Sequence, residues 1–477
     1  MSAAIAKRLD EPADDWVIDD GDRLISWSEL RDRAQSVIEA ARDSEFLILS
    51  GTNSFETVAI IAAGAVSKKP VILVNPSQPH ERIVTSLCGF GGRSWVDERL
   101  HGLVLEDGPD RIARLPISEL GYILFTSGST GQPKGICIGW ENISNTLTWA
   151  RNTLRRRESE IIGLASPAYF DIGYFEVIYS LCFGHKIVIF PDAANYFQCA
   201  EIIQNKSVTT IFSVPLFFSH LAKAWRRVSD PTASQLRVLI SGGDFLDPET
   251  ARYWINYCTL VNVWGPSETS VVNSAWEISR RDIADVVAGG IPSFPIGHLS
   301  TDMDIRVESV DHLRESPIGE VGELVIYGNS VGLGYLDGTP SSGYGRSDST
   351  KFFRTGDLGF REDGGRLFIQ GRSDFMVKIG GHRVDPREIE FWLQQHREIN
   401  QVCVVPITVR GQTVLGVAVS VHGGTKNLSL ASLRNQLRGR VPAYMLPKRM
   451  VALDNFPTNL NGKIDRKKLA ILVENHD

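Results

Sequence analysis

Apolar runs of strand length alternate with amphipathic segments of helix length along most of this 477-residue chain. The runs rich in Val, Ile and Leu that are typical of buried strands are residues 46–51, 70–75, 185–190, 208–214 and 236–243. Between such runs lie segments, for example residues 54–69, whose apolar positions recur at helical spacing. This alternation predicts an α/β fold in which mixed or largely parallel sheets are flanked by helices.

The pattern changes beyond about Pro292. Short glycine-bounded strands, such as residues 322–328 and 366–371, indicate a small antiparallel or β-barrel-like subregion. A charged turn then precedes an amphipathic helix that begins at Pro386. We therefore expect a domain boundary at Asp374, with a large domain of residues 1–374 and a small α+β domain of residues 375–477.

Composition narrows the class of protein. The chain has 50 Lys and Arg against 56 Asp and Glu, with 43% hydrophobic residues, which is ordinary for a globular protein. No Lys/Arg-rich block stands out, so a nucleic-acid partner is not expected. The N-terminal residues carry Asp and Glu, and no apolar run reaches about 18 residues, so we expect a cytoplasmic protein without membrane attachment. The six cysteines form no CxxC pair, which argues against a zinc site or a disulfide framework.

The most informative segment is YILFTSGSTGQPKG at residues 122–135, where a predicted strand leads into a loop rich in Gly, Ser and Thr. Glycines let the backbone approach a ligand, and hydroxyl and N–H groups can donate to phosphate oxygens. The candidate phosphate-binding residues are Thr126, Ser127, Gly128, Ser129, Thr130, Gly131 and Lys134. The segment is neither a Walker A loop nor GxGxxG, and a flexible surface turn is the alternative interpretation.

SGSTGQPKG resembles the phosphate loop of the adenylate-forming superfamily, which includes acyl-CoA synthetases, luciferases and adenylation domains of nonribosomal peptide synthetases. Further segments resemble that family's motifs in the family's order: ISWSEL at 25–30, YFDIGYFE at 169–176, VNVWGPSET at 261–269, GELVIYGNSVGLGYL at 322–336, FRTGDL at 353–358, GRSDFMVKIGGHRVDPREIE at 371–390 and NGKIDR at 461–466. The resemblance covers essentially the whole chain. It implies activation of a carboxylic acid by ATP and Mg²⁺, and a mobile C-terminal lid that pivots at the hinge residue Asp374 between two catalytic orientations.

The resemblance also implies the nucleotide contacts. Beyond the loop, they are Gly243, Val263, Trp264, Gly265, Asp357, Arg372 and Lys463. A carboxylate such as Asp357 can accept hydrogen bonds from the two ribose hydroxyls, with Arg372 as a second ribose or phosphate contact. Trp264 offers a flat face to adenine, although core packing is the alternative. The family usually has Tyr in place of Trp264 and Thr in place of Ser267.

Three residues are candidates for the chemistry itself. Glu268 can coordinate Mg²⁺, which prefers one or two carboxylates together with substrate phosphates. Lys463 can stabilise the negative charge that builds on phosphorus when a carboxylate attacks the α-phosphate, and it can also contact the carboxylate substrate. Thr126, at the start of the loop, is the third. The alternative for Lys463 is a solvated lysine in a basic tail.

Asp171 indicates which acid is activated. In the amino-acid-activating branch of the family an Asp at this motif position binds the substrate ammonium group, and burial of an unpaired carboxylate would be costly. Capping of a helix is the alternative role. By the same resemblance the rest of the substrate pocket would comprise Ile172, Phe175, Phe212, Ile240, Gly242, Val263, Val271, Val272 and Lys463. Because the side chains around the substrate's own side chain are apolar, we expect an aliphatic amino acid of the Val, Leu or Ile kind.

The interpretation that follows is a stand-alone amino acid adenylation enzyme of the nonribosomal peptide synthesis type, in natural product biosynthesis. It would make aminoacyl-AMP and transfer the aminoacyl group to the phosphopantetheine thiol of a separate carrier protein, since only 11 residues follow Arg466. D-alanine is disfavoured, because D-alanine-activating relatives have Cys in place of Gly242. An acyl- or aryl-CoA synthetase, an amide synthetase that uses a free amine, and a nucleotide-binding module without catalysis stay open. So do the exact amino acid and its stereochemistry.

Overall fold

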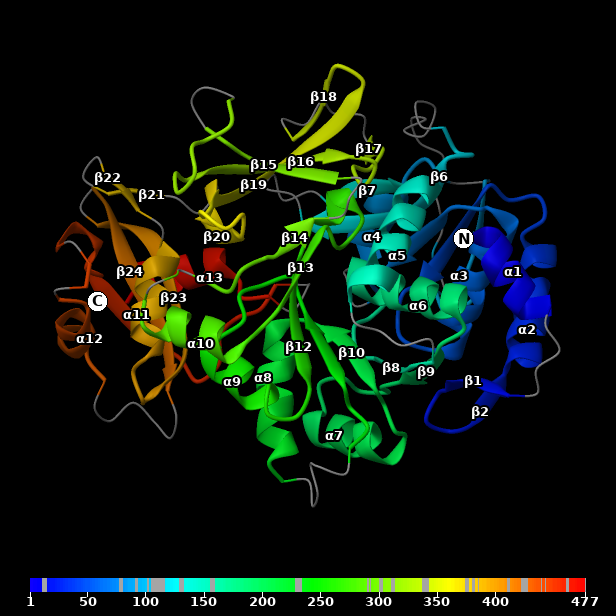
Figure 1. The fold of residues 1–477 in the computed structure, drawn as a ribbon, viewed down its shortest axis with the longest axis horizontal. Helices are drawn as coiled ribbons and strands as arrows, with labels where there is room; N and C mark the ends of the chain where they lie inside the picture. Colours follow the sequence, from blue (N-terminus) through cyan, green and yellow to red (C-terminus); the bar gives the residue numbers. More distant parts are fainter. Residues whose placement is uncertain are drawn as a thin grey trace. The chain divides into compact units, whose positions relative to one another are not determined.

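The structure is a computed structural model of the chain (Figure 1). It describes all residues except 11–14, 77–79, 91–92, 101–102, 104–115, 128–132, 155–158, 228–233, 290, 292, 300–302, 310–313, 337–342, 374–376, 380–381, 385, 410–411, 422–427, 439, 442, 460–462 and 477. The described part divides into two compact units. The N-terminal unit comprises Met1–Thr355 and Gly359–Ile369, and the C-terminal unit comprises Gly356–Leu358 and Gln370–Asp477. The expected boundary residue, Asp374, lies outside the described residues.

Two sheets of mostly parallel strands form the core of the N-terminal unit. The strands of the larger sheet are β1 (Trp16–Asp19), β2 (Leu24–Ser26), β8 (Ile161–Leu164), β9 (Lys186–Ile189), β10 (Thr210–Ser213), β11 (Val238–Ser241), β12 (Thr259–Trp264), β13 (Ser274–Glu277) and β14 (His298–Leu299). Their order is β14-β13-β12-β11-β10-β8-β9-β1-β2. Pairing is parallel from β12 to β1 and antiparallel at both edges.

The second sheet has the order β17-β7-β6-β4-β3-β5. Its strands are β3 (Phe46–Ser50), β4 (Val71–Val74), β5 (Ser94–Val96), β6 (Leu120–Ser127), β7 (Pro133–Gly139) and β17 (Gly334–Tyr335). Strands β3 to β6 pair in parallel, whereas β7 runs antiparallel to both β6 and β17. All five apolar runs singled out in the sequence are strands of these two sheets, which confirms the predicted α/β class.

Helices link and cover these sheets. Those of the N-terminal unit are α1 (Ser2–Asp10), α2 (Trp27–Ala40), α3 (Phe55–Ser67), α4 (His80–Leu87), α5 (Trp140–Thr153), α6 (Asp171–Phe183), α7 (Tyr196–Asn205), α8 (Pro215–Trp225), α9 (Pro248–Trp254), α10 (Arg280–Val287) and the 3₁₀ turn η2 (Ser267–Thr269). Helix α3 begins where the Ser54 side chain accepts from Thr57 N, as an N-cap does.

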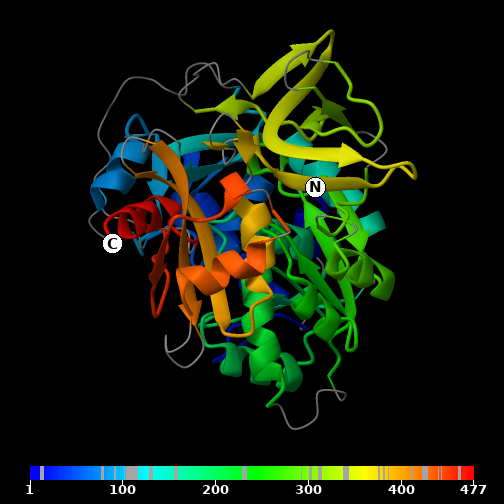
Figure 2. The same cartoon turned by 90° about the vertical axis from the view of Figure 1, so that its left-hand side faces the viewer.

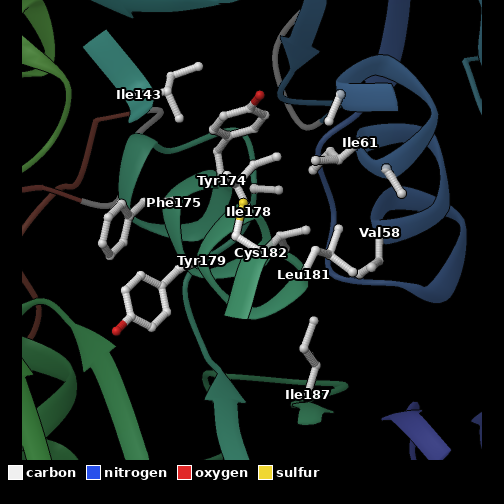
Figure 3. Packing of buried hydrophobic residues seen from close by; sticks show 14 of the residues in the cluster. Val58, Ile61, Ile143, Tyr174, Phe175, Ile178, Tyr179, Leu181, Cys182 and Ile187 are labelled. Atoms are coloured by element: carbon white, nitrogen blue, oxygen red, sulfur yellow. The ribbon is translucent and has the colours of Figure 1, made fainter. Parts of the chain in front are cut away.

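Helices α3 and α6 pack together in the main apolar core. Both are buried on nearly every side, and they share one cluster with strands of both parallel sheets. Figure 3 shows Val58 and Ile61 of α3 facing Ile178 and Leu181 of α6. A helix that is apolar all round is typical of such an interior position, and α6 is thereby fixed at its buried side.

The strands beyond residue 292 form a separate antiparallel sheet, as the glycine-rich pattern predicts. They are β15 (Met303–Glu308), β16 (Gly322–Gly328), β18 (Tyr344–Ser347), β19 (Thr350–Arg361) and β20 (Leu367–Arg372). The order is β15-β16-β19-β18, with β20 beside β19. Buried residues of β15, β16 and β19 share an apolar cluster with Trp264 of the larger parallel sheet.

The C-terminal unit has a small α+β fold of its own (Figures 1 and 2). Its elements are β21 (Val377–Ile379), β22 (His382–Val384), α11 (Pro386–Gln394), β23 (Ile399–Val409), β24 (Gln412–Val421), α12 (Leu430–Leu437), the 3₁₀ turn η4 (Ala443–Met445), β25 (Arg449–Ala452) and α13 (Arg466–Glu474). Strands β23, β24 and β25 form a sheet, against which α11 and α13 pack.

The described part of the chain contains no helix whose length and apolar character would let it cross a bilayer. None of the six cysteines, all within that part, forms a disulfide.

A buried ion pair joins the N-terminal ends of neighbouring parallel strands. Glu160, which precedes β8, is fully buried and forms an ion pair with Arg237, which precedes β11. The same carboxylate accepts hydrogen bonds from Thr209 and from Thr210, the first residue of β10. One side chain thus ties together the starts of β8, β10 and β11.

We expect Glu160→Ala to lower the free energy of unfolding by about 3 to 5 kcal/mol, because the change leaves the Arg237 guanidinium without its buried partner. Asp32→Ala is the matched control, since it removes a pair with Arg31 in which the Asp32 side chain is 72% exposed. Its cost should stay below about 1 kcal/mol. Urea denaturation followed by circular dichroism measures both. Equal losses for the two variants would contradict the role given to Glu160.

Candidate active site

Asp171 is the first residue of α6 and is held in place on both carboxylate oxygens. Ile172 N donates to its Oδ1 at 2.8 Å, and the Ser267 hydroxyl donates to its Oδ2. The N-cap itself is Phe170, whose side chain makes no capping bond, so Asp171 is a first-turn carboxylate of the kind the helix dipole favours. The hydrogen bond from Ser267 joins Asp171 to the turn that carries Glu268.

Beside Asp171 lies a wall of apolar side chains. The phenyl rings of Phe175 and Phe212 meet edge to face with centroids 6.0 Å apart. A Cβ added to Gly242 would lie 2.7 Å from Val263 Cγ2 and 3.4 Å from the Phe212 ring. The apolar residues expected to line the substrate pocket share one buried cluster: Ile172, Phe175, Phe212, Ile240, Val263, Val271 and Val272. All seven are thus buried in the main apolar core, where Phe175 contacts Phe212 and position 242 lies close to Val263 and Phe212; Figure 3 shows Phe175 on α6.

The turn after β12 has a strained backbone. Ser270 and Val271 adopt positive φ angles of 65° and 79°, which is rare for any residue with a side chain and most unusual for a β-branched one. Asn273 stabilises this conformation, since its N donates to Trp264 O at 2.9 Å and its Nδ2 to Thr269 O at 3.0 Å. Gly265 is required here, because a Cβ would lie 2.5 Å from Val271 O. Strain of this kind is concentrated at functional sites.

Glu268 lies in this turn and is held by residues 332–335. Gly332 N donates to Glu268 O at 2.9 Å, and Tyr335 Oη donates to Glu268 Oε1 at 2.7 Å. The ring of Tyr335 also contacts Lys134, whose Nζ lies 5.3 Å from the ring centroid. Burial, together with the negative charge of Glu268, raises the pKa of the adjacent Tyr344, whose Oη lies 3.4 Å from Glu268 O.

Tyr335 was missed in the sequence. Its segment, residues 322–336, was recognised as a motif. The signal that could have pointed to Tyr335 is an aromatic residue that lies among glycines. Its contacts depend on the pairing of β17 with β7, in which Tyr335 lies opposite Ile136, two residues from Lys134. Nothing local in the sequence specifies that register.

The donor set around Glu268 suits Mg²⁺. A single carboxylate oriented by a hydrogen bond is what this ion uses when substrate phosphates and water supply its remaining ligands. The described residues contain no group of three or more His, Cys, Asp or Glu that would form a complete protein cage.

The phosphate loop is described only at its two ends. Thr126 and Ser127 end β6, and Thr126 lies opposite Lys134 of β7. Residues Gly128, Ser129, Thr130 and Gly131 lie outside the described part. The predicted strand before the loop is present, so Lys134 follows the loop on the returning strand.

Two of the predicted nucleotide-binding residues, Trp264 and Gly243, have different surroundings. Trp264 is 9% exposed and packs with Ile296, Ile305 and Val331, so most of its surface serves the core. Its stacking on adenine stays a prediction. Gly243 has a φ of +84°, a conformation that favours glycine, and an added Cβ there would be 4.0 Å from Ile172 Cδ1.

The C-terminal unit carries the remaining candidates. Arg372 Nη1 donates to Asp357 Oδ1 at 2.9 Å, and the Asp357 carboxylate is mostly buried. Lys463 is exposed, in a turn where its N donates to Asn459 Oδ1 at 3.1 Å and its carbonyl accepts from Asn459 N at 2.7 Å.

Arg466 anchors the Lys463 turn to the body of this unit. Its guanidinium donates to Glu390 Oε2 at 2.8 Å and to Val404 O at 2.9 Å, and Glu390 Oε1 accepts from Val404 N at 2.6 Å. Burial raises the pKa of Glu390, which Arg466 opposes. These contacts tie α11, β23 and α13 together at a residue three positions after Lys463.

Comparison with known families decides the class of protein. Residues 95–336 match the family described as AMP-binding enzyme, and residues 388–463 match the AMP-binding enzyme C-terminal domain. The chain belongs to the AMP-binding enzyme family. It is accordingly an adenylate-forming ligase, as the motifs predicted.

Several curated proteins are similar to this AMP-binding enzyme. The D-alanine–D-alanyl carrier protein ligase of Bacillus velezensis is 28% identical over 431 residues, which cover 84% of each chain. Phosphinothricin tripeptide synthetase PhsC of Streptomyces viridochromogenes is 30% identical over 87% of this chain, which spans only 39% of that protein.

Solved structures share the fold. ATP-bound MatB from Rhodopseudomonas palustris superposes with a TM-score of 0.81 at 21% identity, over 100% of this chain and 99% of that chain. A four-domain nonribosomal peptide synthetase bound to AMP and glycine gives a TM-score of 0.80 at 25% identity, over 98% of this chain and 36% of that one.

We expect Arg466→Ala to loosen the turn that carries Lys463. The backbone amides of Asn459 and Asp465 both donate hydrogen bonds within this turn. Their hydrogen exchange should accelerate by roughly tenfold or more, because the turn can then open without breaking the contact between Arg466 and Glu390. Exchange measured by mass spectrometry on fragments covering residues 455–470 tests this. Lys467→Ala, an exposed change in the same helical turn, is the control. Unchanged exchange in Arg466→Ala would show that the turn is ordered without this anchor.

Proposed function

We propose that this enzyme activates an apolar aliphatic amino acid, of the Val, Leu or Ile kind, as its aminoacyl adenylate. It then transfers the aminoacyl group to the phosphopantetheine thiol of a carrier protein. The observation that carries the proposal is the oriented carboxylate of Asp171 beside the apolar wall of Phe175, Phe212 and Val263. An ammonium group at Asp171 and a hydrocarbon side chain against the wall would match both features.

The apolar wall accounts for the proposed side-chain class. A charged or hydrogen-bonding substrate side chain placed against Ile172, Phe212 and Val263 would lose water without gaining a partner. Gly242 lets Val263 and Phe212 approach closely, and a side chain at position 242 would require Val263 to move. The pocket proposed here therefore differs in its packing from one that has Cys in place of Gly242.

In the first step, an oxygen of the amino acid carboxylate attacks the α-phosphorus of ATP. The new oxygen–phosphorus bond forms as the α–β phosphoanhydride bond breaks, and pyrophosphate leaves. Lys463 would stabilise the charge that develops on the phosphoryl oxygens, and Lys134 would bind the leaving phosphates. Mg²⁺ held by Glu268 would neutralise phosphate charge. Asp357, oriented by Arg372, would accept hydrogen bonds from the ribose diol.

In the second step, the sulfur of the phosphopantetheine thiol attacks the carbonyl carbon of the adenylate. The carbon–sulfur bond forms, AMP leaves, and the thiol proton passes to solvent. The name of the D-alanine–D-alanyl carrier protein ligase supports a carrier protein as the acceptor. The resemblance supports rotation of the C-terminal unit at Asp374 between the two steps.

A panel of acids in ATP–pyrophosphate exchange tests this proposal. Val, Leu and Ile should give the strongest signals, and Val should differ by roughly tenfold from Leu and Ile, because a methylene contributes about 1 to 3 kcal/mol to discrimination. The comparison set is Asp, Lys, D-Ala and benzoate. Intact-mass analysis then follows loading of holo-carrier proteins, with coenzyme A and free amines as alternative acceptors. A best signal with benzoate or a charged amino acid would contradict the substrate class, and loading of coenzyme A alone would contradict the acceptor.

The role of Asp171 has its own test. We expect Asp171→Ala to lower kcat/KM for the amino acid by about 100-fold or more, because the buried ammonium loses its counter-charge. Ser267→Ala should cost roughly tenfold through loss of one charge-assisted hydrogen bond, whereas Ser267→Thr keeps the hydroxyl and should restore most activity. The KM for ATP is the internal control and should change little. If Asp171→Ala leaves kcat/KM intact, the enzyme activates a plain carboxylic acid.

A further inference from the structure

Tyr335 contacts both charged groups that the proposed function assigns to the phosphate end of ATP. Its hydroxyl donates to Glu268 Oε1 at 2.7 Å, and its ring lies 5.3 Å from Lys134 Nζ. The first contact comes from a turn of the larger parallel sheet, and the second comes from β7 of the other sheet. One side chain thus bridges two elements that are 134 positions apart in the sequence, from residue 134 to residue 268.

Each of these contacts orients a charged group, the Glu268 carboxylate or the Lys134 ammonium, and does not neutralise its charge. A hydroxyl donated to a carboxylate at 2.7 Å is a charge-assisted hydrogen bond, and it leaves the carboxylate negative. An ammonium beside an aromatic ring is attracted by the ring's quadrupole and keeps its positive charge. An arginine or lysine in this position would instead neutralise Glu268 and repel Lys134.

The backbone around Tyr335 is fixed independently of its hydroxyl. Gly332 N donates to Glu268 O, and Tyr335 pairs with Ile136 across β17 and β7. Tyr344 packs edge to face against the Tyr335 ring with centroids 5.3 Å apart. Removal of the hydroxyl alone should therefore remove its hydrogen bond to Glu268 while the turn and the ring stay in place.

We propose that Tyr335 is a positioning residue for adenylation. It fixes the Glu268 carboxylate through its hydroxyl and the Lys134 ammonium through its ring, so that the metal-binding and phosphate-binding groups keep a set spacing. It also keeps these opposite charges on separate partners, because a direct Lys134–Glu268 ion pair would compete with the nucleotide for both. The inference rests on the proposed function, in which Glu268 holds Mg²⁺ and Lys134 binds phosphate.

Two substitutions separate the two contacts. Tyr335→Phe keeps the ring and removes the hydroxyl, so only the hold on Glu268 is lost. Tyr335→Leu removes both contacts. Tyr327→Phe is the matched control, because Tyr327 also donates its hydroxyl to a glutamate, Glu308, in the separate antiparallel sheet.

The readout is ATP binding by isothermal titration calorimetry, with Mg²⁺ and with EDTA, and it requires no turnover. For Tyr335→Phe we expect the Mg²⁺-dependent gain in ATP affinity to fall by roughly tenfold or more, the scale for loss of a residue that orients a metal ligand. Binding in EDTA should stay unchanged, since the Lys134 contact remains. Tyr335→Leu should weaken ATP binding in EDTA as well. In exchange assays, the Mg²⁺ concentration for half-maximal rate should rise, while the KM for the amino acid changes less than twofold.

The possible outcomes are distinguishable. The role of Tyr335 is overturned if Mg²⁺ raises the ATP affinity of Tyr335→Phe as much as that of the wild type. It is also overturned if Tyr327→Phe loses as much of this Mg²⁺-dependent gain as Tyr335→Phe does. Weaker binding of Tyr335→Phe in EDTA would also contradict it, because the hydroxyl is assigned to the metal ligand alone. If the wild-type enzyme activates no amino acid yet the binding results hold, the proposed substrate is wrong and the role of Tyr335 stands. Thermal unfolding of each variant with EDTA confirms that the fold is kept.

Discussion

The short turn between β12 and β13 is the constraint on which the candidate site depends. Its first side chain, Ser267, orients Asp171, and the next, Glu268, is held by Tyr335. The left-handed backbone at Ser270 and Val271 persists only because Gly265 allows close approach and Asn273 bonds back across the turn. Recognition of the amine and of the metal-bound phosphates would therefore share one rigid segment, so that the two substrates are set at a fixed distance from each other.

Carboxylates in this molecule have partners that suit different tasks. Glu160 and Glu390 are buried against arginine, a pairing that satisfies the charge and ties elements of the fold together. Asp171 accepts from the Ser267 hydroxyl and from Ile172 N, and Glu268 accepts from the Tyr335 hydroxyl, so these hydrogen bonds come from neutral donors. Asp357 pairs with Arg372, which is compatible with its proposed ligand, a neutral ribose diol. Neutral donors are thus present at the proposed cation-binding carboxylates, and arginine is present at the structural ones.

Sequence patterns predicted most of the fold and named much of the candidate site. Buried strands such as β3 and β11 are continuous apolar runs, which have few alternative structures at that length. The residues proposed for the apolar wall were taken from strand and helix motifs at fixed offsets, and the structure buries them in the main apolar core. Contacts between strands that are distant in the sequence were not predicted. Tyr335 contacts Lys134 only because β17 pairs with β7 in this register, which no local sequence pattern encodes. The burial of Trp264 likewise depends on the antiparallel sheet formed beyond residue 300.

The proposed roles divide between the two units in a way that has a physical rationale. Selection of the acid requires a preformed surface, and the wall around Phe212 and Val263 is part of the main apolar core, where side chains cannot easily adjust. Lys463, in contrast, is exposed, and its turn is bonded through Arg466 to the interior of its own unit. With Arg466 bonded in this way, Lys463 would move mainly together with its unit. If it acts in adenylation and then withdraws, the whole C-terminal unit must carry it, so the change has to occur in the few backbone angles that connect the units.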